Sequence, residues 1–340
     1  MMGARNRAAL AAAMLVIAQV TACSTCQGLT PVSMPTPSPS RQAAPVPTSG
    51  ATPPAPFLAV VPAPVFPGAG APRASGRVAA RPRRIFSKEL SRSLDAFLAG
   101  YGGRTAASVS DLSTGRRYHY HHTLQLPSAN TSKVSILTAL LLGTRWHELG
   151  EQARSDASDM IRFSDNEAAD RLYERIGMRP GLASANRRLG LRRTYTPGGW
   201  CAAQYCWGVA QTTVEDQIRL VKALATGKSP LAAPERRRVL GLMAKVTPEQ
   251  KWGISAGACE SDQVSLKNGW LRHTANGRWA VASAGLIRGH GHDYAVAVLT
   301  EDSPSMETGI ARIEGVTRRL MDAFRGGRGC EATANRAPGP

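Results

Sequence analysis

Long apolar runs are scarce in this sequence of 340 residues. The run at residues 8–18 has about the length of a signal-peptide core and is shorter than the roughly 20 apolar residues that a permanent transmembrane helix needs. Arg5 and Arg7 precede it and supply the short positive segment with which such peptides begin. The sequence therefore predicts an exported protein whose residues 1–22 are removed as a signal peptide.

The segment around Cys23 resembles the signal of bacterial lipoproteins. Small residues precede it directly (Val20-Thr21-Ala22), and in that signal the peptide is cut before the cysteine, whose sulfur is then acylated. An ordinary signal peptide that happens to contain a cysteine is the alternative. The resemblance implies an extracytoplasmic protein, anchored to the cell membrane by a lipid on Cys23.

Acidic residues are also scarce, with 24 Asp and Glu against 42 Lys and Arg, a formal net charge of +18 and a pI near 10.4. An exported protein meets lipid head groups and wall polymers rather than nucleic acid. The charge therefore predicts contact with the envelope and no nucleic-acid partner. A genome of high GC content, which favours arginine, is an alternative explanation of the same composition.

Metal-binding patterns are scarce as well, because the C-x-x-C pair of the sequence, Cys23 and Cys26, includes the predicted lipidation site, and no helical pair of histidines appears. Two groups of histidines (His119, His121 and His122; His290 and His292) fall at expected strand ends or turns, where exposed histidines are common. We therefore predict no metal and no other cofactor.

Export permits disulfides. Five cysteines remain when the predicted lipidation site is set aside. Cys201 and Cys206 are close enough to close one loop, whereas Cys259 and Cys330 could tie the C-terminal tail to the body. Cys26 is then left over, and the sequence leaves this connectivity open.

The chain divides by composition into a tether and a domain. Residues 23–84 are rich in Pro, Ala, Ser and Thr and cannot bury enough apolar surface to offset the entropy of ordering, so they are predicted to be a disordered tether. One domain is expected at residues 85–326, followed by a tail at 327–340. No internal repeat is found.

The expected domain mixes helices with antiparallel strands. Apolar periodicity predicts a helix from Ser87 to about residue 100, a hairpin at 105–122, a mainly helical subdomain at roughly 130–260, strands at 263–267, 278–287 and 294–300, and a helix at 307–324. This order predicts an α/β fold of the α+β type, in which an antiparallel five-stranded sheet is flanked by helices and lies beside an all-helical subdomain.

Three short segments carry the chemistry. They are Asn130-Thr131-Ser132-Lys133 before the apolar helix 134–142, Ser164-Asp165-Asn166 between two helical stretches, and Lys267-Asn268-Gly269 at the end of a strand. In this order they resemble the S-x-x-K, S-D-N and K-T/S-G motifs of the class A β-lactamase and penicillin-binding-protein superfamily. The resemblance covers about residues 87–324 and implies the fold of that family.

The resemblance also implies roles. In the family, a lysine deprotonates a serine one turn before it, and that serine attacks a carbonyl carbon, while backbone N–H groups stabilise the oxyanion. By position, the candidate catalytic residues are Lys133, Ser164 and Asn166, with Asn130 at the nucleophile position. The candidate substrate-binding residues are Asp165, Lys267, Asn268 and Gly269, where Asn268 replaces the family's hydroxyl residue.

The nucleophile itself is missing. Asn130 stands where the family has serine, and its amide nitrogen, with a delocalised lone pair, cannot accept an acyl group in this way. Residues 176–214 contain no Asp or Glu, although class A enzymes place there the glutamate that activates the deacylating water. The resemblance thus implies a pseudoenzyme. A bland interpretation is that Asn130 is a helix N-cap and that residues 164–166 form a capping turn.

Three functions follow from this reading. The first is a binding protein for a peptidoglycan stem peptide or a β-lactam-like small molecule. The second is an active serine hydrolase, a β-lactamase or DD-peptidase, that uses Ser128 or Ser132; Ser132 lies about 200° around a helix from position 130 and should point elsewhere. The third is a scaffold for another envelope protein. Tryptophans at 200, 207, 252 and 270 could line a ligand groove, although packing is the commoner fate of tryptophan.

Overall fold

The computed structural model describes residues 88–197, 206–289, 291–326 and 330. Contacts divide the chain into two units, residues 1–74 and 75–340, and every described residue belongs to the second unit. The predicted signal peptide, the lipidation site at Cys23, the tether and Cys201 all lie outside the described residues. None of the helices described is both long and apolar enough to cross a membrane.

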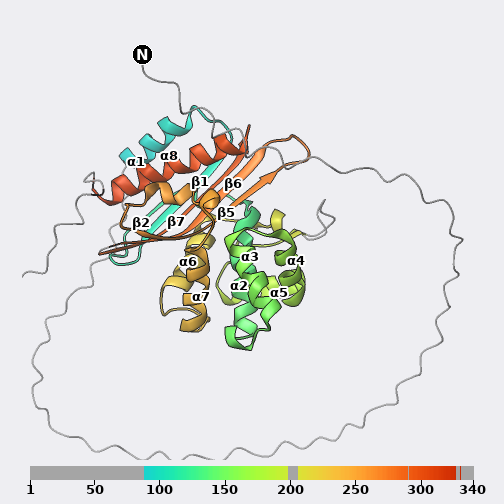
Figure 1. Cartoon of the computed structure of the whole chain (residues 1–340). Helices are drawn as coiled ribbons and strands as arrows, with labels where there is room; N and C mark the ends of the chain where they lie inside the picture. The colour runs from blue at the N-terminus through green and yellow to red at the C-terminus, as the bar shows by residue number, and fades with distance from the viewer. Residues whose placement is uncertain (1–87, 198–205, 290, 327–329, 331–340) are drawn as a thin grey trace, which may run out of the picture. The chain divides into compact units, whose positions relative to one another are not determined.

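A five-stranded antiparallel sheet forms the centre of the domain, with the strand order β2-β1-β7-β6-β5 (Figure 1). The strands are β1 (Arg104–Asp111), β2 (Arg117–Tyr120), β5 (Gln263–Arg272), β6 (Trp279–Gly289) and β7 (His292–Ser303). Small and branched apolar residues run continuously through the middle of β7, because helices cover both faces of the sheet there. The predicted fold class is confirmed.

Two helices, α1 (Lys88–Leu98) and α8 (Met306–Phe324), cover one face of the sheet (Figure 1). Ile313, Val316 and Leu320 of α8 recur at helical spacing and are fully buried against strand residues such as Val296 and Val298. Ser305 begins α8, since its hydroxyl accepts the backbone N–H of Thr308 at 3.1 Å. The last predicted helix is therefore confirmed to within one residue at its start.

The helices of the second layer lie on the opposite face (Figure 1). They are α2 (Ser132–Gly143), α3 (Glu151–Arg162), α4 (Asn166–Arg175), α5 (Met178–Arg188), α6 (Val214–Ala225) and α7 (Ala233–Met243). Helix α6 packs on the sheet through Val214, Ile218 and Val221. Helix α2 is apolar on all sides, and nine of its twelve residues are buried, as expected for the central helix of such a layer.

Short elements join the two layers next to the chemistry-bearing residues. Strand β3 (Leu126–Pro127) pairs with β4 (Gln211–Thr212), and β3 leads directly into a 3₁₀ turn, η1 (Ala129–Thr131). Two further 3₁₀ turns, η3 (Cys206–Val209) and η5 (Gly253–Gly257), lie before β4 and β5. The sequence patterns did not predict these pieces, because each is at most five residues long, too short for an apolar periodicity to repeat over several periods.

Two local predictions are wrong. The Lys267-Asn268-Gly269 motif lies in the middle of β5 rather than at its end, because pairing with β6 continues to Arg272. Asn130 is not a helix N-cap: it lies inside η1, and Thr131 takes the N-cap position of α2 without a side-chain hydrogen bond. The 3₁₀ turn inserts between the expected cap and the helix, so the local cap pattern was misleading.

The predicted link between the tail and the body is confirmed by a disulfide between Cys259 and Cys330, whose Cα atoms are 5.4 Å apart across 71 residues of sequence. Cys206 is also disulfide-bonded, although its expected partner Cys201 lies outside the described residues. The tail is therefore joined to the body just before the third motif's strand.

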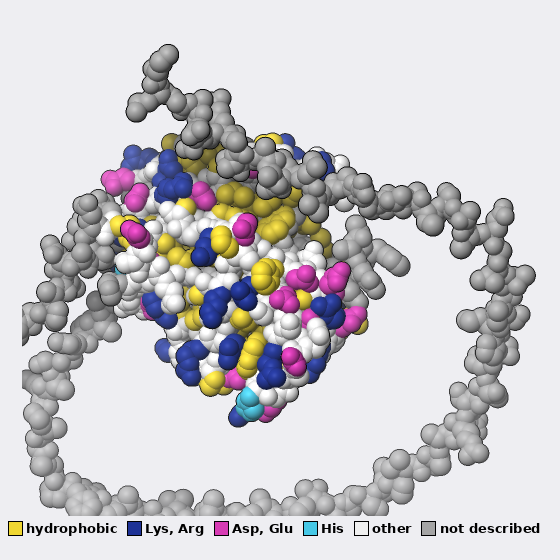
Figure 2. All heavy atoms as spheres, viewed as in Figure 1, with side chains coloured by type: hydrophobic (Ala, Val, Ile, Leu, Met, Phe, Trp, Pro, Cys, Tyr) yellow, Lys and Arg dark blue, Asp and Glu magenta, His cyan; other side chains and the backbone are white. Residues whose placement is uncertain are grey.

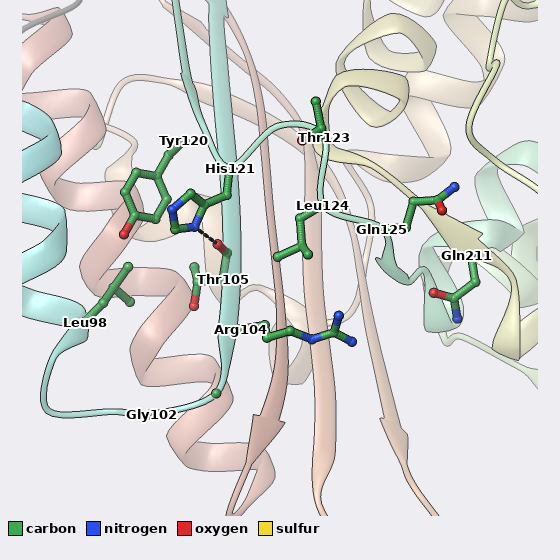
Figure 3. A pocket seen from close by; sticks show the side chains of 11 residues that line it. Leu98, Gly102, Arg104, Thr105, Tyr120, His121, Thr123, Leu124, Gln125 and Gln211 are labelled. Carbon is green, nitrogen blue, oxygen red and sulfur yellow. Dashed lines mark hydrogen bonds between the residues drawn. The ribbon is translucent and has the colours of Figure 1, made fainter.

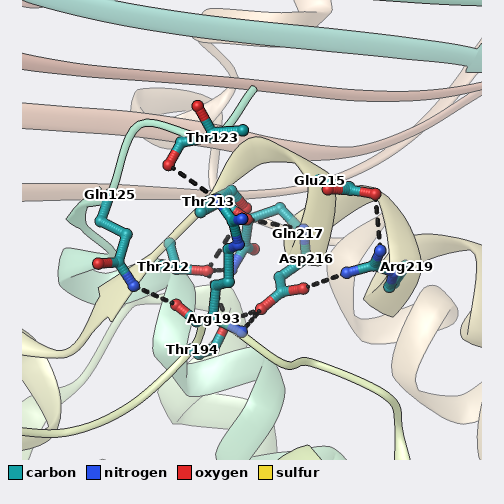
Figure 4. Close-up of polar contacts among 10 residues, drawn as sticks. All are labelled: Thr123, Gln125, Arg193, Thr194, Thr212, Thr213, Glu215, Asp216, Gln217 and Arg219. Atoms are coloured by element: carbon teal, nitrogen blue, oxygen red, sulfur yellow. Dashed lines mark hydrogen bonds and ion pairs between the residues drawn. The ribbon is translucent and has the colours of Figure 1, made fainter. Parts of the chain in front are cut away.

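A buried carboxylate fixes the segment between α5 and α6 (Figure 4). The Asp216 side chain is fully buried and accepts the backbone N–H of Arg193 at 2.7 Å and the Thr194 hydroxyl at 2.8 Å. The Arg219 guanidinium donates to its other oxygen at 2.7 Å. The Thr213 hydroxyl caps α6 by accepting the backbone N–H of Asp216 at 3.2 Å. These bonds position β4, and β4 in turn positions the turn that holds Asn130.

We predict that Asp216→Ala lowers the free energy of unfolding by about 3 kcal/mol or more, because it leaves the Arg193 N–H and the Thr194 hydroxyl without their acceptor and removes the buried one of the two carboxylates that pair with Arg219. Glu215→Ala is the matched control: Glu215 also pairs with Arg219, at 2.6 Å, but is 35% exposed, so its loss should cost less than about 1 kcal/mol. Urea unfolding of both variants measures the difference. Equal losses would show that Asp216 is no more than a surface partner of Arg219.

Candidate functional site

The backbone around Asn130 is strained and tightly enclosed. Ala129 has a φ of +46°, in the left-handed region that residues with a side chain rarely adopt. A Cβ atom on Gly269 of β5 would lie 2.7 Å from the backbone N of Asn130 and 2.9 Å from the backbone O of Ser128. Only glycine therefore allows the strand to approach the turn, which brings the first and third motifs together.

Lys133 is the second residue of α2, three residues after Asn130, and is fully buried. Its ammonium group donates to three oxygens of the second motif: the backbone O of Ser164 at 2.6 Å, the hydroxyl of Ser164 at 3.2 Å and Oδ1 of Asn166 at 2.7 Å. Ser164 has a φ of +60°, and this turn directs both its carbonyl and its hydroxyl toward the lysine. The first and second motifs therefore meet at the ammonium group of Lys133.

Lys267 reaches the same hydroxyl from the sheet. Its ammonium group, also fully buried, lies 3.0 Å from Ser164 Oγ, 3.0 Å from the backbone O of Asn268 and 3.3 Å from Oε1 of Gln250. The three side chains of Lys133, Ser164 and Lys267 thus form one cluster, here called the lysine centre. Gln250, which precedes η5, is part of its surroundings and was not predicted, since no motif marks it.

The other predicted binding residues lie around this centre without joining it. Asn268 is fully buried, and its amide nitrogen donates to the backbone O of Gln250 at 2.8 Å and of Trp252 at 3.0 Å. Its side chain therefore holds the segment before η5 in place. Asp165 is exposed and caps α4 by accepting the backbone N–H of Ala168 at 2.7 Å. The capping turn and the chemical motif are consequently the same segment.

A match to a family model now identifies this arrangement. Residues 152–324, half of the chain, match the model described as the beta-lactamase enzyme family. The chain belongs to the β-lactamase enzyme family. The matched residues include the second and third motifs, Ser164–Asn166 and Lys267–Gly269.

Known proteins are similar to this chain in sequence or in fold. The protein LppW of Mycobacterium tuberculosis, named as a lipoprotein, is 25% identical over 240 residues, which cover 68% of this chain and 72% of LppW. The penicillin-binding protein PBP-A has a similar structure, with a TM-score of 0.62, 19% identity and coverage of 72% of this chain and 98% of that one. The TLA-1 extended-spectrum β-lactamase has a TM-score of 0.61 at 16% identity, covering 69% and 98%. These structures share the fold.

In this member of the β-lactamase family, the two serines proposed as alternative nucleophiles are occupied elsewhere. The hydroxyl of Ser128 donates to the backbone O of Ala210 at 2.9 Å, and that of Ser132 donates to the backbone O of Ala129 at 2.8 Å. Both residues are buried. Each hydroxyl thus stabilises the backbone around η1. Asn130 is the residue of η1 that is partly exposed, whereas its neighbours Ala129 and Thr131 are buried.

Trp207 of η3 lies beside Lys133 of the lysine centre. Its ring centre lies 4.8 Å from Lys133 Nζ, in cation–π geometry, and its indole N–H donates to Oδ1 of Asp170 at 2.6 Å. Asp170, on α4, was not predicted, because nothing in the sequence distinguishes it from any other surface acid. The Trp207 ring and the Asp170 carboxylate, which are hydrogen-bonded to each other, therefore both lie near Lys133.

The electrostatics of the centre follow from burial. The described acceptors of both ammonium groups are neutral oxygens, so burial is poorly compensated. Burial lowers the pKa of Lys133 from its ordinary 10.5 to about 7, although the charges of Asp165 and Asp170 oppose the shift. Burial, together with the charge of Lys133, lowers the pKa of Lys267 well below its ordinary value. An anion bound beside these lysines would favour their protonated forms, so the centre is suited to an anionic ligand.

Other features lie away from the lysine centre. Within the described ranges, no group of three His, Cys, Asp or Glu side chains is placed to hold a metal ion. A groove of about 840 Å³ is lined by Leu98, Arg104, Tyr120 and His121, and His121 Nδ1 lies 3.1 Å from the backbone O of Thr105 (Figure 3).

Trp252 and Trp270 lie next to the third motif, with their ring centres 6.2 Å apart.

We predict that Lys133 titrates near pH 7, about three units below an exposed lysine. Nuclear magnetic resonance of ¹³Cε-labelled lysine should show one such transition, absent from Lys133→Met and retained in Lys245→Met, an exposed control. Because the unfolded chain binds more protons at this site between pH 7 and 10.5, wild-type stability should rise with pH through that window relative to Lys133→Met. If every lysine titrates near pH 10, burial does not control this site.

Proposed function

We propose that this chain is an exported, lipid-anchored member of the β-lactamase family that binds ligands without hydrolysing them. The ligands are peptidoglycan stem peptides or chemically similar β-lactam-like molecules, which carry an acyl-amino-acid unit and a carboxylate. One observation carries the proposal: the lysine centre is complete and buried, while Asn130 occupies the turn from which the family's nucleophile acts.

The centre has the chemistry for reversible binding. Lys267 and Lys133 supply positive charge for a carboxylate, and their lowered pKa values mean that an anion would favour the protonated forms. Asn130 can donate and accept hydrogen bonds through its amide but cannot form an acyl intermediate. Binding that is not converted into stabilisation of a transition state gives affinity without turnover.

The lipid anchor has separate support. Small residues precede Cys23 as they do in lipoprotein signals, and the relative LppW is named as a lipoprotein.

The positions of Ser128 and Ser132 count against the alternative of an active serine hydrolase, because both hydroxyls already donate to backbone oxygens.

The first test is reversible binding. An N-acyl-D-alanyl-D-alanine peptide should bind the wild-type chain, and Lys267→Met should weaken binding at least tenfold, because a buried charge that faces the carboxylate is lost. Lys245→Met, an exposed change, is the control and should bind like wild type. Calorimetry measures affinity, and the peptide should be recovered uncleaved. Absence of binding at millimolar peptide and millimolar penicillin would remove the proposal.

The second test restores the missing group. Intact mass spectrometry after incubation with benzylpenicillin should show no adduct on the wild type and one acyl group on Asn130→Ser. Adding Lys133→Met to Asn130→Ser should suppress the adduct, because the buried lysine is the base closest in sequence to the new hydroxyl. An adduct on the wild type would mean that another residue acts as nucleophile, and the non-hydrolytic assignment would be wrong.

A further inference from the structure

A second groove, remote in sequence from the three motifs, gathers basic side chains from four parts of the fold. Its volume is about 980 Å³. The positive residues that line it are Arg117 on β2, Arg187 and Arg188 at the end of α5, Arg219 and Lys222 on α6, and Lys228 before α7. None of the residues of the lysine centre lines this groove. It is a separate feature of the domain, here called the basic groove.

The charge of the basic groove is largely uncompensated. Arg219 is neutralised by Glu215 and Asp216, at 2.6 and 2.7 Å. In the described part of the chain, the other five basic residues form no ion pair, and Asp111, the acidic residue in the lining, is engaged by the backbone N–H groups of Ser113 and Thr114 in its own turn. Like charges therefore face one another across the groove, which favours a bound anion.

Helix dipoles do not account for this grouping. Cations at the ends of α5 and α6 would also be favoured by the negative ends of those helices. Arg117 lies on a strand and Lys228 in a loop, so neither is explained in that way. Lys222 is half-buried, and burial lowers its pKa, with the charges of Arg117 and Lys228 acting in the same direction. The cations are thus close enough to interact.

The floor of the basic groove is apolar. Leu189 and Ala223 are buried beneath the charged rim, and Leu112 lies partly buried beside them. The guanidinium groups of Arg117, Arg187 and Arg188 suit the oxygens of phosphate, which they can bind in pairs of hydrogen bonds. A rim for phosphate above an apolar floor matches an amphiphilic anion better than a simple ion. In Figure 2, Lys and Arg side chains are spread over the face of α6 and α7, whereas Asp and Glu gather near α4.

We propose that the basic groove binds the phosphate head group of an anionic membrane lipid. The phosphate would lie among the arginines of the rim, and the glycerol and first methylene groups would lie on Leu189 and Ala223. A domain carried on a lipid-anchored tether would meet such head groups continually, and its net charge of +18 would hold it near them. This contact does not depend on the lysine centre or on any ligand bound there.

The test compares two triple variants of the full chain, each carrying Cys23→Ser so that no acyl anchor is attached. The groove variant is Arg117→Gln, Arg187→Gln and Arg188→Gln. The control variant removes the same charge at exposed positions outside the groove, through Arg175→Gln, Arg237→Gln and Lys251→Gln. All six side chains are exposed, and unchanged thermal unfolding would verify that both proteins are folded.

Binding is measured by flotation with vesicles of phosphatidylcholine alone or mixed with phosphatidylglycerol, at about 0.15 M ionic strength. Vesicles of phosphatidylcholine alone measure the background binding caused by the N-terminal apolar segment, which all the proteins share. The reference protein, which carries Cys23→Ser alone, should prefer the mixed vesicles. Relative to it, the groove variant should lose about 100-fold in affinity for them, and the control variant should lose only a few-fold.

Three results would overturn the proposal. Equal losses in the two triple variants would mean that general charge, not the groove, attracts the membrane. No preference for phosphatidylglycerol would mean that the groove does not recognise anionic head groups. Complete displacement of the protein from vesicles by millimolar inorganic phosphate, with little effect of millimolar chloride, would identify a soluble phosphate ion as the occupant instead of a lipid.

Discussion

The hydroxyl of Ser164 is the point on which the two layers of this domain depend. It lies 3.2 Å from the ammonium group of Lys133 on α2 and 3.0 Å from that of Lys267 on β5, so one oxygen joins the helical layer to the sheet. Buried cations are tolerated only where acceptors surround them. The left-handed backbone at Ser164, the amide of Asn166 and the side chain of Gln250 are all arranged to meet that requirement.

This arrangement separates binding from chemistry. In the proposed function, the lysines and neutral acceptors of the centre receive a carboxylate, and Asn130, at the position proposed for the family's nucleophile, supplies an amide in place of a hydroxyl. Trp207 and Asp170 lie beside Lys133 and are bound to each other. Under the same proposal, binding energy in this site has no transition state on which to act, and it gives affinity without turnover.

Much of this domain could be predicted from sequence, because its long elements carry strong periodic signals. Helix α8 and strands β6 and β7 were expected within a few residues. The contributions of Gln250 and Asp170 were not expected, and Trp207 was named only as a possible lining of a ligand groove, since each contribution depends on contacts between segments far apart in the chain. The end of β5 was misjudged for the same reason: Gly269 interrupts the apolar pattern, but pairing with β6 carries the strand to Arg272.

Gly269 also explains why the turn at Asn130 keeps the geometry of a working site. The strand lies so close to η1 that any side chain at this position would collide with the backbone N of Asn130. Hydrogen bonds from Ser128 to Ala210 hold the turn from the other side, through the backbone N–H at 2.7 Å and the hydroxyl at 2.9 Å. The strained φ of Ala129 is therefore imposed by its surroundings and not by the chemistry of residue 130. A serine at that position would enter a backbone already shaped to present it, beside a lysine whose pKa is already near neutrality.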